Sequence, residues 1–444
     1  MAKIAVLGGG ESGVGAAVLA KVKGYDVFLS DISTLSADNK RTLKKYGIPF
    51  EEGGHTWDQI LNAGEIIKSP GIPSTAPLVA KAIEMDIPII SEIEFAGRYD
   101  HAKKICITGS NGKTTTTSLI YYMLKNAGLN VGLGGNIGRS YAYQVATEHY
   151  DIYVLELSSF QLDNMYDFKA DIAILLNITP DHLDRYGYDL QNYVNAKFRI
   201  TQNMAPEDCF IFCSDDEITV KNLNQIVIKA QMLAISQERE VALGAYTLDG
   251  VMRVNYGEDP YQMAVSDLTL QGRHNVYNTM AAALTGKLMD ITNDSIRSAL
   301  TSFMPVEHRM EKVLSVKGVL YINDSKATNV NSTWYALECM TTPVVLILGG
   351  KDKGNDYSPL FDLVIEKVRA IVCLGVDNAK IHEAFEDKVP VIVDTLSAEE
   401  AVRAASRLAQ DGDTVLLSPC CASFDLFKSY EDRGQQFKEA VRNL

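Results

Sequence analysis

The sequence lacks any segment that could cross a membrane. No apolar run approaches the ~18–20 unbroken residues of a membrane-spanning helix, and the N-terminal run 3–7 is too short for a signal peptide and leads straight into glycines. The chain also lacks the bias of disordered or fibrous proteins, since 46% of its 444 residues are hydrophobic and 22% are charged. We therefore expect a cytoplasmic globular protein with room for about three domains.

Positive charge and paired cysteines are also scarce. The formal net charge is −14, from 42 Lys and Arg against 56 Asp and Glu. So acidic a surface disfavours nucleic acid and anionic lipid, and any anionic ligand must be captured by a small local site. The seven cysteines are odd in number and lack metal-knuckle spacing, which indicates free thiols in a reducing compartment. Cys209 and Cys213 lie in an apolar run that predicts a buried strand.

Apolar strand-like runs alternate with helical stretches along the whole chain, a pattern typical of α/β proteins with parallel sheets. A strand running into a polar or glycine loop begins afresh near residues 3, 104 and 319. A polar seam at 97–104 and a proline in 303–308 separate these units. We predict domains 1–97, 98–303 and 304–444. The segment 247–270 alternates like strands and predicts a side hairpin of the central domain.

The first glycine loop, Gly-Gly-Gly-Glu-Ser-Gly at 8–13, follows a strand and precedes the helical run 14–22. Asp31 ends the next strand, 18 residues after Gly13. This is the Rossmann fingerprint, in which a diphosphate lies at a helix N-terminus and a carboxylate accepts from a ribose hydroxyl. The motif leaves open a nicotinamide or flavin dinucleotide, another nucleotide diphosphate, and a purely structural turn.

The second glycine loop, Thr-Gly-Ser-Asn-Gly-Lys-Thr at 108–114, opens a predicted helix over 114–126. It departs from the full P-loop pattern because only two residues separate Gly109 from Gly112. The chemistry is still present: backbone N–H groups converge on phosphates, Lys113 can reach the terminal phosphates, and Thr114 offers a hydroxyl to Mg²⁺. The alternative is a glycine turn with an exposed lysine.

Two side chains near strand ends suit a metal–nucleotide site. Glu156 ends the apolar strand 151–156, and the carboxyl ends of parallel strands hold ligands. We predict that it is a Walker-B-like Mg²⁺ ligand; the alternative is a surface acid. His182 follows the strand 171–178. A lone histidine is more often structural, so metal ligation stays an open alternative.

Together with the loop 108–114, longer segments carry a resemblance to the Mur ligases, which form amide bonds on the cytoplasmic peptidoglycan precursor. These segments are 134–138 (Gly-Gly-Asn-Ile-Gly), 155–162 (Leu-Glu-Leu-Ser-Ser-Phe-Gln-Leu), 181–186 (Asp-His-Leu-Asp-Arg-Tyr), 323–329 (Asn-Asp-Ser-Lys-Ala-Thr-Asn) and 417–424 (Leu-Ser-Pro-Cys-Cys-Ala-Ser-Phe). The resemblance implies a Rossmann-like N-terminal domain for a UDP-sugar, a P-loop ATPase-like central domain with a mostly parallel sheet, and a Rossmann-like C-terminal domain for an amino acid.

Within the family, the segments favour ATP-dependent addition of D-glutamate to UDP-N-acetylmuramoyl-L-alanine. The resemblance also implies two Mg²⁺ sites, and we expect a monomer. The implied UDP-sugar residues are Glu11, Ser12, Gly13, Asp31, Ser69, Pro70, Gly71, Asn136 and His182. The implied ATP residues are Gly109, Ser110, Asn111, Gly112, Lys113, Thr114, Thr115, Asn278, Arg309 and Asp324. The implied D-glutamate residues are Lys326, Thr328, Lys353, Ser418 and Phe424.

The resemblance also assigns the chemistry. Thr114 and Glu156 would hold the first Mg²⁺, and His182 and Lys197 the second. Helical lysines are usually solvated, but the family carries here a lysine that reacts with CO₂ to give a carbamate, which requires a neutral, buried amine. The implied catalytic residues are Lys113, Glu156, His182, Lys197 and Arg309.

Other activities remain as alternatives at this point. Within the same chemistry, the chain could be another Mur-type ligase or a folylpolyglutamate-type amide ligase. A P-loop ATPase with another role would hydrolyse ATP without any amino acid. An NAD-dependent oxidoreductase would use the first glycine loop, and bound NAD would reveal it.

Overall fold

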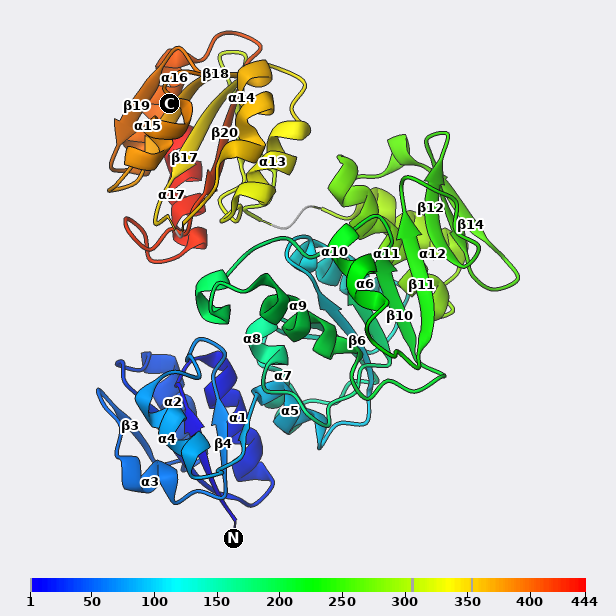
Figure 1. Cartoon of the computed structure of the whole chain (residues 1–444), viewed down its shortest axis with the longest axis vertical. Coiled ribbons are helices and arrows are strands. Elements are labelled where there is room, and N and C mark those ends of the chain that lie inside the picture. The colour runs from blue at the N-terminus through cyan, green and yellow to red at the C-terminus, as the bar shows by residue number, and fades with distance from the viewer. Residues whose placement is uncertain (1, 305–306, 353) are drawn as a thin grey trace. The chain divides into compact units, whose positions relative to one another are not determined.

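The computed structural model describes residues 2–304, 307–352 and 354–444, whose strands form three β-sheets (Figure 1). The described residues divide into two compact units. The first unit runs to Leu268 and includes 277–302; the second holds 269–276 and the chain from Phe303 onward. The first two sheets belong to the first unit, and the third sheet belongs to the second. The boundaries predicted at 97 and 303 stay a prediction.

The first sheet is parallel, with strand order β3-β2-β1-β4-β5. The chain leaves β1 at the point where the order reverses, so the glycine loop 8–13 lies where ligands bind in such sheets. The predicted helix after this loop is confirmed and begins three residues earlier, at Glu11. The elements are β1 (Lys3–Leu7), α1 (Glu11–Val22), β2 (Asp26–Asp31), α2 (Ala37–Lys45), β3 (Phe50–Glu52), α3 (Trp57–Leu61), β4 (Glu65–Lys68), α4 (Pro77–Glu84), β5 (Ile89–Ile90) and α5 (Glu92–Gly97).

The second sheet has the order β14-β13-β12-β11-β10-β9-β6-β8-β7. It is parallel from β7 to β12, while β12, β13 and β14 pair antiparallel, which confirms the strand hairpin predicted in 247–270. The buried strand predicted at Cys209–Cys213 is confirmed as β10, and every cysteine is free, all being in the described part of the chain. The strands are β6 (Lys103–Thr108), β7 (Val131–Gly135), β8 (Ile152–Glu156), β9 (Ile172–Leu175), β10, β11 (Gln231–Ser236), β12 (Gly244–Leu248), β13 (Val251–Asn255) and β14 (Tyr261–Ala264).

The helices of this region connect the parallel strands. Among them, α6 and α9 flank the second glycine loop, and Figure 1 shows α8 and α9 beside the carboxyl end of the sheet. No helix in the described ranges is long and apolar enough to span a bilayer. The helices are α6 (Lys113–Asn126), α7 (Tyr141–Thr147), α8 (Ser159–Leu162), α9 (Leu190–Phe198), α10 (Glu217–Leu223), α11 (Arg273–Leu288) and α12 (Asn293–Ser302).

The third sheet, order β15-β16-β20-β17-β18-β19, is parallel except for β15. Its central strands are buried on both faces, which explains their unbroken apolar runs. One core lies under α13, α14 and α15, the other under α16 and α17. The elements are β15 (Glu311–Val316), β16 (Val319–Asn323), α13 (Val330–Glu338), β17 (Val344–Gly349), α14 (Phe361–Lys367), β18 (Val368–Leu374), α15 (Ala379–Phe385), β19 (Ile392–Thr395), α16 (Ala398–Leu408), β20 (Thr414–Cys420) and α17 (Tyr430–Arg442).

Helices α1, α5 and α7 join the first two sheets through a buried carboxylate. Gly15 of α1 lies against α7 so closely that an added Cβ would come within 1.9 Å of Ser140 Oγ. Glu92 accepts hydrogen bonds from Ser140 Oγ (2.6 Å) and the Ala142 N–H (2.7 Å). Its second oxygen has no partner among the described residues. Burial raises the pKa of Glu92 to about 7, helped by the nearby charge of Glu11.

We expect this carboxyl group to make stability depend on pH. The folded-state pKa lies above the ordinary value of 4.5, so the folded state favours the protonated form. This contribution is complete below pH 4.5 and is lost as the pH rises to about 7, a difference of about 3 kcal/mol. Glu92→Gln keeps the accepting oxygen and should flatten the dependence, gaining stability over wild type at pH 8. Urea midpoints of both proteins from pH 4 to 8 test this; parallel curves would contradict it.

Candidate active site

The loop between β6 and α6 contains two glycines with positive φ angles, Gly109 (φ 149°) and Gly112 (φ 85°). Side chains rarely adopt these conformations. An added Cβ on Gly112 would lie 2.3 Å from Asn278 Oδ1, so Asn278, in the first half of α11, packs directly on the loop. The predicted helix begins at Lys113, immediately after the loop. The loop therefore presents its backbone at a helix N-terminus, as phosphate binding requires, and residues 108–114 are called the phosphate loop below.

Residues after β9 hold this loop in place. The Ser110 N–H donates to the Asn177 carbonyl (2.9 Å), and the Asn111 N–H donates to Asn177 Oδ1 (2.9 Å). Ser110 Oγ donates to the Thr179 carbonyl (2.9 Å). Lys113 Nζ donates to the carbonyls of Gly109 (2.7 Å) and Ser110 (2.8 Å), so its ammonium lies over the loop. No local pattern indicated a role for Asn177, because this contact joins two strand ends that are distant along the chain.

Glu156 lies beside the loop with an unused oxygen. It pairs in register with Ile107 of β6, and its side chain is buried. Asn136 Nδ2 donates to Oε1 (2.7 Å), while Oε2 has no partner within the described part of the chain. Thr114 is buried in the first turn of α6, next to Lys113. A buried carboxylate oxygen without a donor is costly unless a cation binds it, so this oxygen fits a Mg²⁺ ligand.

Lys197 of α9 is only 1% exposed, contrary to the solvated position that a helical lysine usually takes. Its Nζ donates to the Gly109 carbonyl (2.8 Å) and lies 4.5 Å from the centre of the Tyr193 ring. Burial lowers the pKa of Lys197 well below its ordinary value, and the charge of Lys113 lowers it further. The amine of Lys197 therefore loses its proton more readily than the amine of an exposed lysine.

His182 lies in a turn that faces the first domain's loop. It has a left-handed backbone (φ 53°) and its ring stands edge-on to Phe160, with centroids 5.1 Å apart. Arg185 of the same turn donates to the carbonyls of Pro70 (3.3 Å) and Gly71 (3.2 Å). The structure therefore brings the predicted segment 69–71 together with the predicted His182 turn, through Arg185, which lies in the motif 181–186 but was given no role from the sequence.

In the first glycine loop, the carboxylate of Asp31 is engaged with the backbone. It accepts from the N–H groups of Gly9 (2.5 Å) and Ser33 (2.7 Å). Gly13 packs so tightly that an added Cβ would lie 1.8 Å from the Gly8 carbonyl oxygen. Glu11 Oε1 accepts from the Ser140 N–H (3.1 Å). Asp31 and Glu11 thus shape the loop and its junction with α7; their contact with a nucleotide stays a prediction.

In the second unit, a buried carboxylate organises the predicted residues. Asp324 accepts from Ser418 Oγ (2.9 Å) and the Met310 N–H (3.2 Å). Burial raises the pKa of Asp324 to about 7, while the Ser418 hydrogen bond and the charge of Arg309 oppose the rise. The remaining predicted residues are nearer the surface: Lys326, whose Nζ donates to Tyr430 OH (3.0 Å), half-buried Thr328, and Phe424, which is 71% exposed. Lys353 lies outside the described residues.

Arg433 of α17 ties together the loops at the carboxyl ends of β16, β17 and β20, and sequence patterns did not reveal it. Its side chain is fully buried. It donates to Ser325 Oγ (3.0 Å) and carbonyl (2.8 Å), to the Cys421 carbonyl (3.2 Å) and to the Gly349 carbonyl (3.4 Å). A single arginine in a polar helix normally predicts a solvated side chain, so no local signal distinguishes this one.

Arg433→Met should destabilise the protein by about 2–4 kcal/mol, because several buried carbonyls lose their donor while the volume is kept. Urea denaturation measures the change. Arg442→Met, at the exposed end of the same helix, is the matched control and should change stability by less than about 0.5 kcal/mol. Equal effects of the two substitutions would contradict the role of Arg433.

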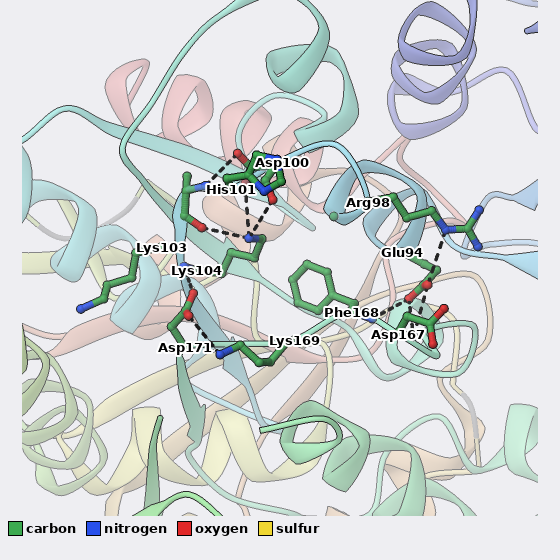
Figure 2. Close-up of a pocket in the computed structure, with 12 residues that line it drawn as sticks. Glu94, Arg98, Asp100, His101, Lys103, Lys104, Asp167, Phe168, Lys169 and Asp171 are labelled. Atoms are coloured by element: carbon green, nitrogen blue, oxygen red, sulfur yellow. Dashed lines mark hydrogen bonds and ion pairs between the residues drawn. The ribbon is translucent and has the colours of Figure 1, made fainter. Parts of the chain in front are cut away.

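A cavity of about 440 Å³ lies at the amino end of β6, the end opposite the phosphate loop. Figure 2 shows that its charged residues largely pair with one another. Glu94 accepts from the Tyr166, Asp167 and Phe168 N–H groups, Lys104 lies 3.7 Å from Asp100, and Lys169 lies 3.5 Å from Asp171. These contacts join α5 to the segment before β9 and indicate a structural junction.

Comparisons with known proteins point in one direction. Family models match residues 3–77 (MurD N-terminal domain), 107–286 (Mur ligase middle domain) and 308–421 (Mur ligase, glutamate ligase domain). A protein of Bacteroides fragilis named UDP-N-acetylmuramoylalanine--D-glutamate ligase is 59% identical, with 100% of both chains covered. One of the same name from Porphyromonas gingivalis is 55% identical, covering 99% of this chain and 98% of its own.

Solved structures give the same fold. The UDP-N-acetylmuramate-alanine ligase MurC of Thermotoga maritima superposes with a TM-score of 0.64 at 18% identity, covering both chains completely. A pseudomurein peptide ligase type C of Methanothermus fervidus also has a TM-score of 0.64, at 20% identity and full coverage of both chains. The predicted α/β class with mostly parallel sheets is confirmed.

Proposed function

The chain belongs to the Mur ligase family, and from that premise we propose that it is the ATP-dependent ligase that adds D-glutamate to UDP-N-acetylmuramoyl-L-alanine. The observation that carries this proposal is the 55–59% identity, over essentially the full length, to relatives named for that reaction. The residues of the phosphate loop support it, because Lys113, Glu156 and Lys197 gather beside one helix N-terminus. We further propose that the enzyme acts in the cytoplasm as a monomer.

The reaction has two steps. The terminal carboxylate of UDP-N-acetylmuramoyl-L-alanine attacks the γ-phosphorus of ATP; the P–O bond to the β-phosphate breaks, and ADP leaves with the electron pair. The amine of D-glutamate then attacks the carbonyl carbon of the acyl phosphate. The tetrahedral intermediate collapses, phosphate leaves, and the nitrogen loses a proton. Two anions must meet in the first step, so Lys113 contributes by electrostatic stabilisation and no protein nucleophile is required.

We propose two Mg²⁺ sites. We propose Thr114 and Glu156 for the first, since the Glu156 Oε2 atom is buried without a donor among the described residues. We propose His182 and Lys197 for the second. When bound, Mg²⁺ reduces the repulsion between the substrate carboxylate and the triphosphate, and it prefers hard oxygen ligands.

Lys197 as a bare ammonium would repel a cation, so we propose that it is carbamylated. The ammonium first loses one proton. The neutral amine then attacks CO₂: an N–C bond forms, one C=O electron pair moves onto oxygen, and the nitrogen releases a second proton. Together these steps convert a positive side chain into a negative one with two oxygens. The burial of Lys197 and the low pKa of its amine support this step, because only the neutral amine reacts.

The other assignments follow the family. We propose that 1–97 bind the UDP-sugar through residues 11–13, Asp31 and segment 69–71, and that Asn136 and His182 reach it from the central domain. We propose that 98–303 bind ATP through residues 109–115 and Asn278, and that 304–444 bind D-glutamate. For this last domain the proposed residues are Lys326, Thr328, Lys353, Ser418 and Phe424, with Arg309 and Asp324 assigned to ATP.

An ADP-release assay with UDP-N-acetylmuramoyl-L-alanine and a panel of amino acids tests the function. We expect ADP and phosphate only when ATP, UDP-N-acetylmuramoyl-L-alanine and D-glutamate are all present. L-Glutamate should give little product, because inversion misplaces the amine or a carboxylate. Turnover with a different amino acid would favour another Mur-type or folylpolyglutamate-type ligase. ADP release without any amino acid would favour a P-loop ATPase, and tightly bound NAD an oxidoreductase.

A further inference from the structure

The outer strands of the third sheet place a thiol, an imidazole and a carboxylate together, and none of the three is a residue assigned to the ligase reaction. Cys373 and Asp394 are direct partners in the parallel register of β18 and β19. Register partners in a parallel pair point to the same face of the sheet. Helix α15 packs on that face, with Ile381 and Phe385 in the same core cluster as Cys373, and it brings His382 to the pair.

The distances suit a metal ion. One ligand atom each from Cys373, His382 and Asp394 all lie within 4.8 Å of one another. His382 Nε2 is 3.1 Å from both carboxylate oxygens of Asp394. In a tetrahedral zinc site with bonds of about 2.0 Å, neighbouring nitrogen and oxygen ligands are about 3.3 Å apart. The sulfur is buried and the carboxylate is exposed. The site therefore opens to solvent on the carboxylate side and is closed by the protein interior on the sulfur side.

A second observation comes from Asn378, in the turn before α15. Its Nδ2 donates to Asp394 Oδ1 (2.9 Å) and to the Gly375 carbonyl (3.1 Å). Its Oδ1 is buried and has no hydrogen-bond partner among the residues described. Outer-shell donors of this kind orient the ligands of metal sites, and a buried carbonyl oxygen without a donor is costly unless something binds it.

We propose that Cys373, His382 and Asp394 form a Zn²⁺ site, with the Asn378 amide orienting Asp394 and a water molecule completing the coordination. The mixed sulfur, nitrogen and oxygen donor set favours Zn²⁺ over Mg²⁺, which prefers oxygen alone. Sulfur binds as thiolate, so binding displaces the thiol proton. The site joins β18, α15 and β19, and the ion would fasten the edge of the sheet. It does not depend on the proposed ligase reaction.

Cobalt titration of the full, metal-free protein tests this site, with Mg²⁺ in excess to fill the oxygen sites. Co²⁺ should give a thiolate-to-metal charge-transfer band at one equivalent, and Zn²⁺ should abolish it. Cys373→Ser should remove the band, and His382→Gln should weaken binding by about 100-fold or more. Asn378→Ala, which removes no sulfur, should weaken binding by about 10–100-fold.

Cys209→Ser and His149→Gln are the matched controls. Cys209 is another buried free thiol, and His149 is an exposed histidine 3.7 Å from Asp151. Both variants should keep the band. As a second readout, Zn²⁺ should raise the melting temperature of wild type and of both controls but not of His382→Gln. A missing band in wild type, or a band that survives Cys373→Ser, would overturn the proposal. So would equal zinc stabilisation of wild type and His382→Gln.

Discussion

Lys197→Ala should be nearly inactive, and a small carboxylate such as acetate should restore part of the turnover. The amine of Lys197 is buried beside the phosphate loop, 2.8 Å from the Gly109 carbonyl, so its loss leaves a space next to the proposed second Mg²⁺. Acetate carries the charge and the two oxygens of a carbamate and is small enough to enter that space. ADP release at saturating substrates, with and without acetate, measures the rescue.

Lys197→Arg is the control that separates charge from volume. The guanidinium fills the same space but keeps a positive charge and cannot form a carbamate under these conditions. We expect no activity and no rescue by acetate. A variant that turns over as fast as wild type would contradict the carbamate. For the unmodified protein, ¹³C NMR with labelled bicarbonate should show one slowly exchanging carbamate signal that Lys197→Ala lacks.

The burial of Lys197 also shows where sequence patterns stop being informative. On composition, a lysine in a polar helix predicts a solvated side chain. Its actual position depends on α9 packing against the strand end that precedes the phosphate loop, a contact between residues 88 apart in the chain. Only the family resemblance indicated a buried amine here, and the lowered pKa of Lys197 agrees with that expectation.

Local signals were sufficient for the elements around the loops. The helix after Gly112, the buried strand at Cys209–Cys213 and the strand hairpin within 247–270 follow from apolar periodicity and glycine positions, and the structure contains all of them. These features depend on neighbouring residues, so a single sequence carries them. The position of Glu156 at a strand end followed in the same way.

Buried polar residues outside motifs could not be predicted. Arg433 and Glu92 each look like ordinary helical charges in the sequence, and each is buried because distant segments close around it. Asp31 shows a related effect. Its spacing after the glycine loop predicts a ribose contact, while the folded loop directs two backbone N–H groups at the same carboxylate. The motif predicts that Asp31 lies at the glycine loop, but the packing of the loop decides which carboxylate oxygens remain available to a ligand.

Lys113→Ala should lower turnover by about 10²–10³, because one charge that stabilises the transition state is lost, worth about 3–4 kcal/mol. The fold should persist. The Lys113 ammonium donates to carbonyls of its own loop, and the loop keeps its bonds to Asn177. The measurements are kcat at saturating ATP and the melting temperature. Lys125→Ala, an exposed lysine on the same helix, should leave both unchanged.

The same variant distinguishes direct from indirect action. The charge of Lys113 helps to lower the pKa of Lys197, so removing it should raise that pKa and disfavour carbamate formation. If activity were lost only by this route, excess bicarbonate at higher pH would restore it. Direct charge stabilisation predicts no such recovery, since the missing cation is then the one that faces the triphosphate. Retention of more than about a tenth of wild-type turnover would remove Lys113 from the proposed catalytic residues, whereas recovery with bicarbonate would assign it to positioning Lys197.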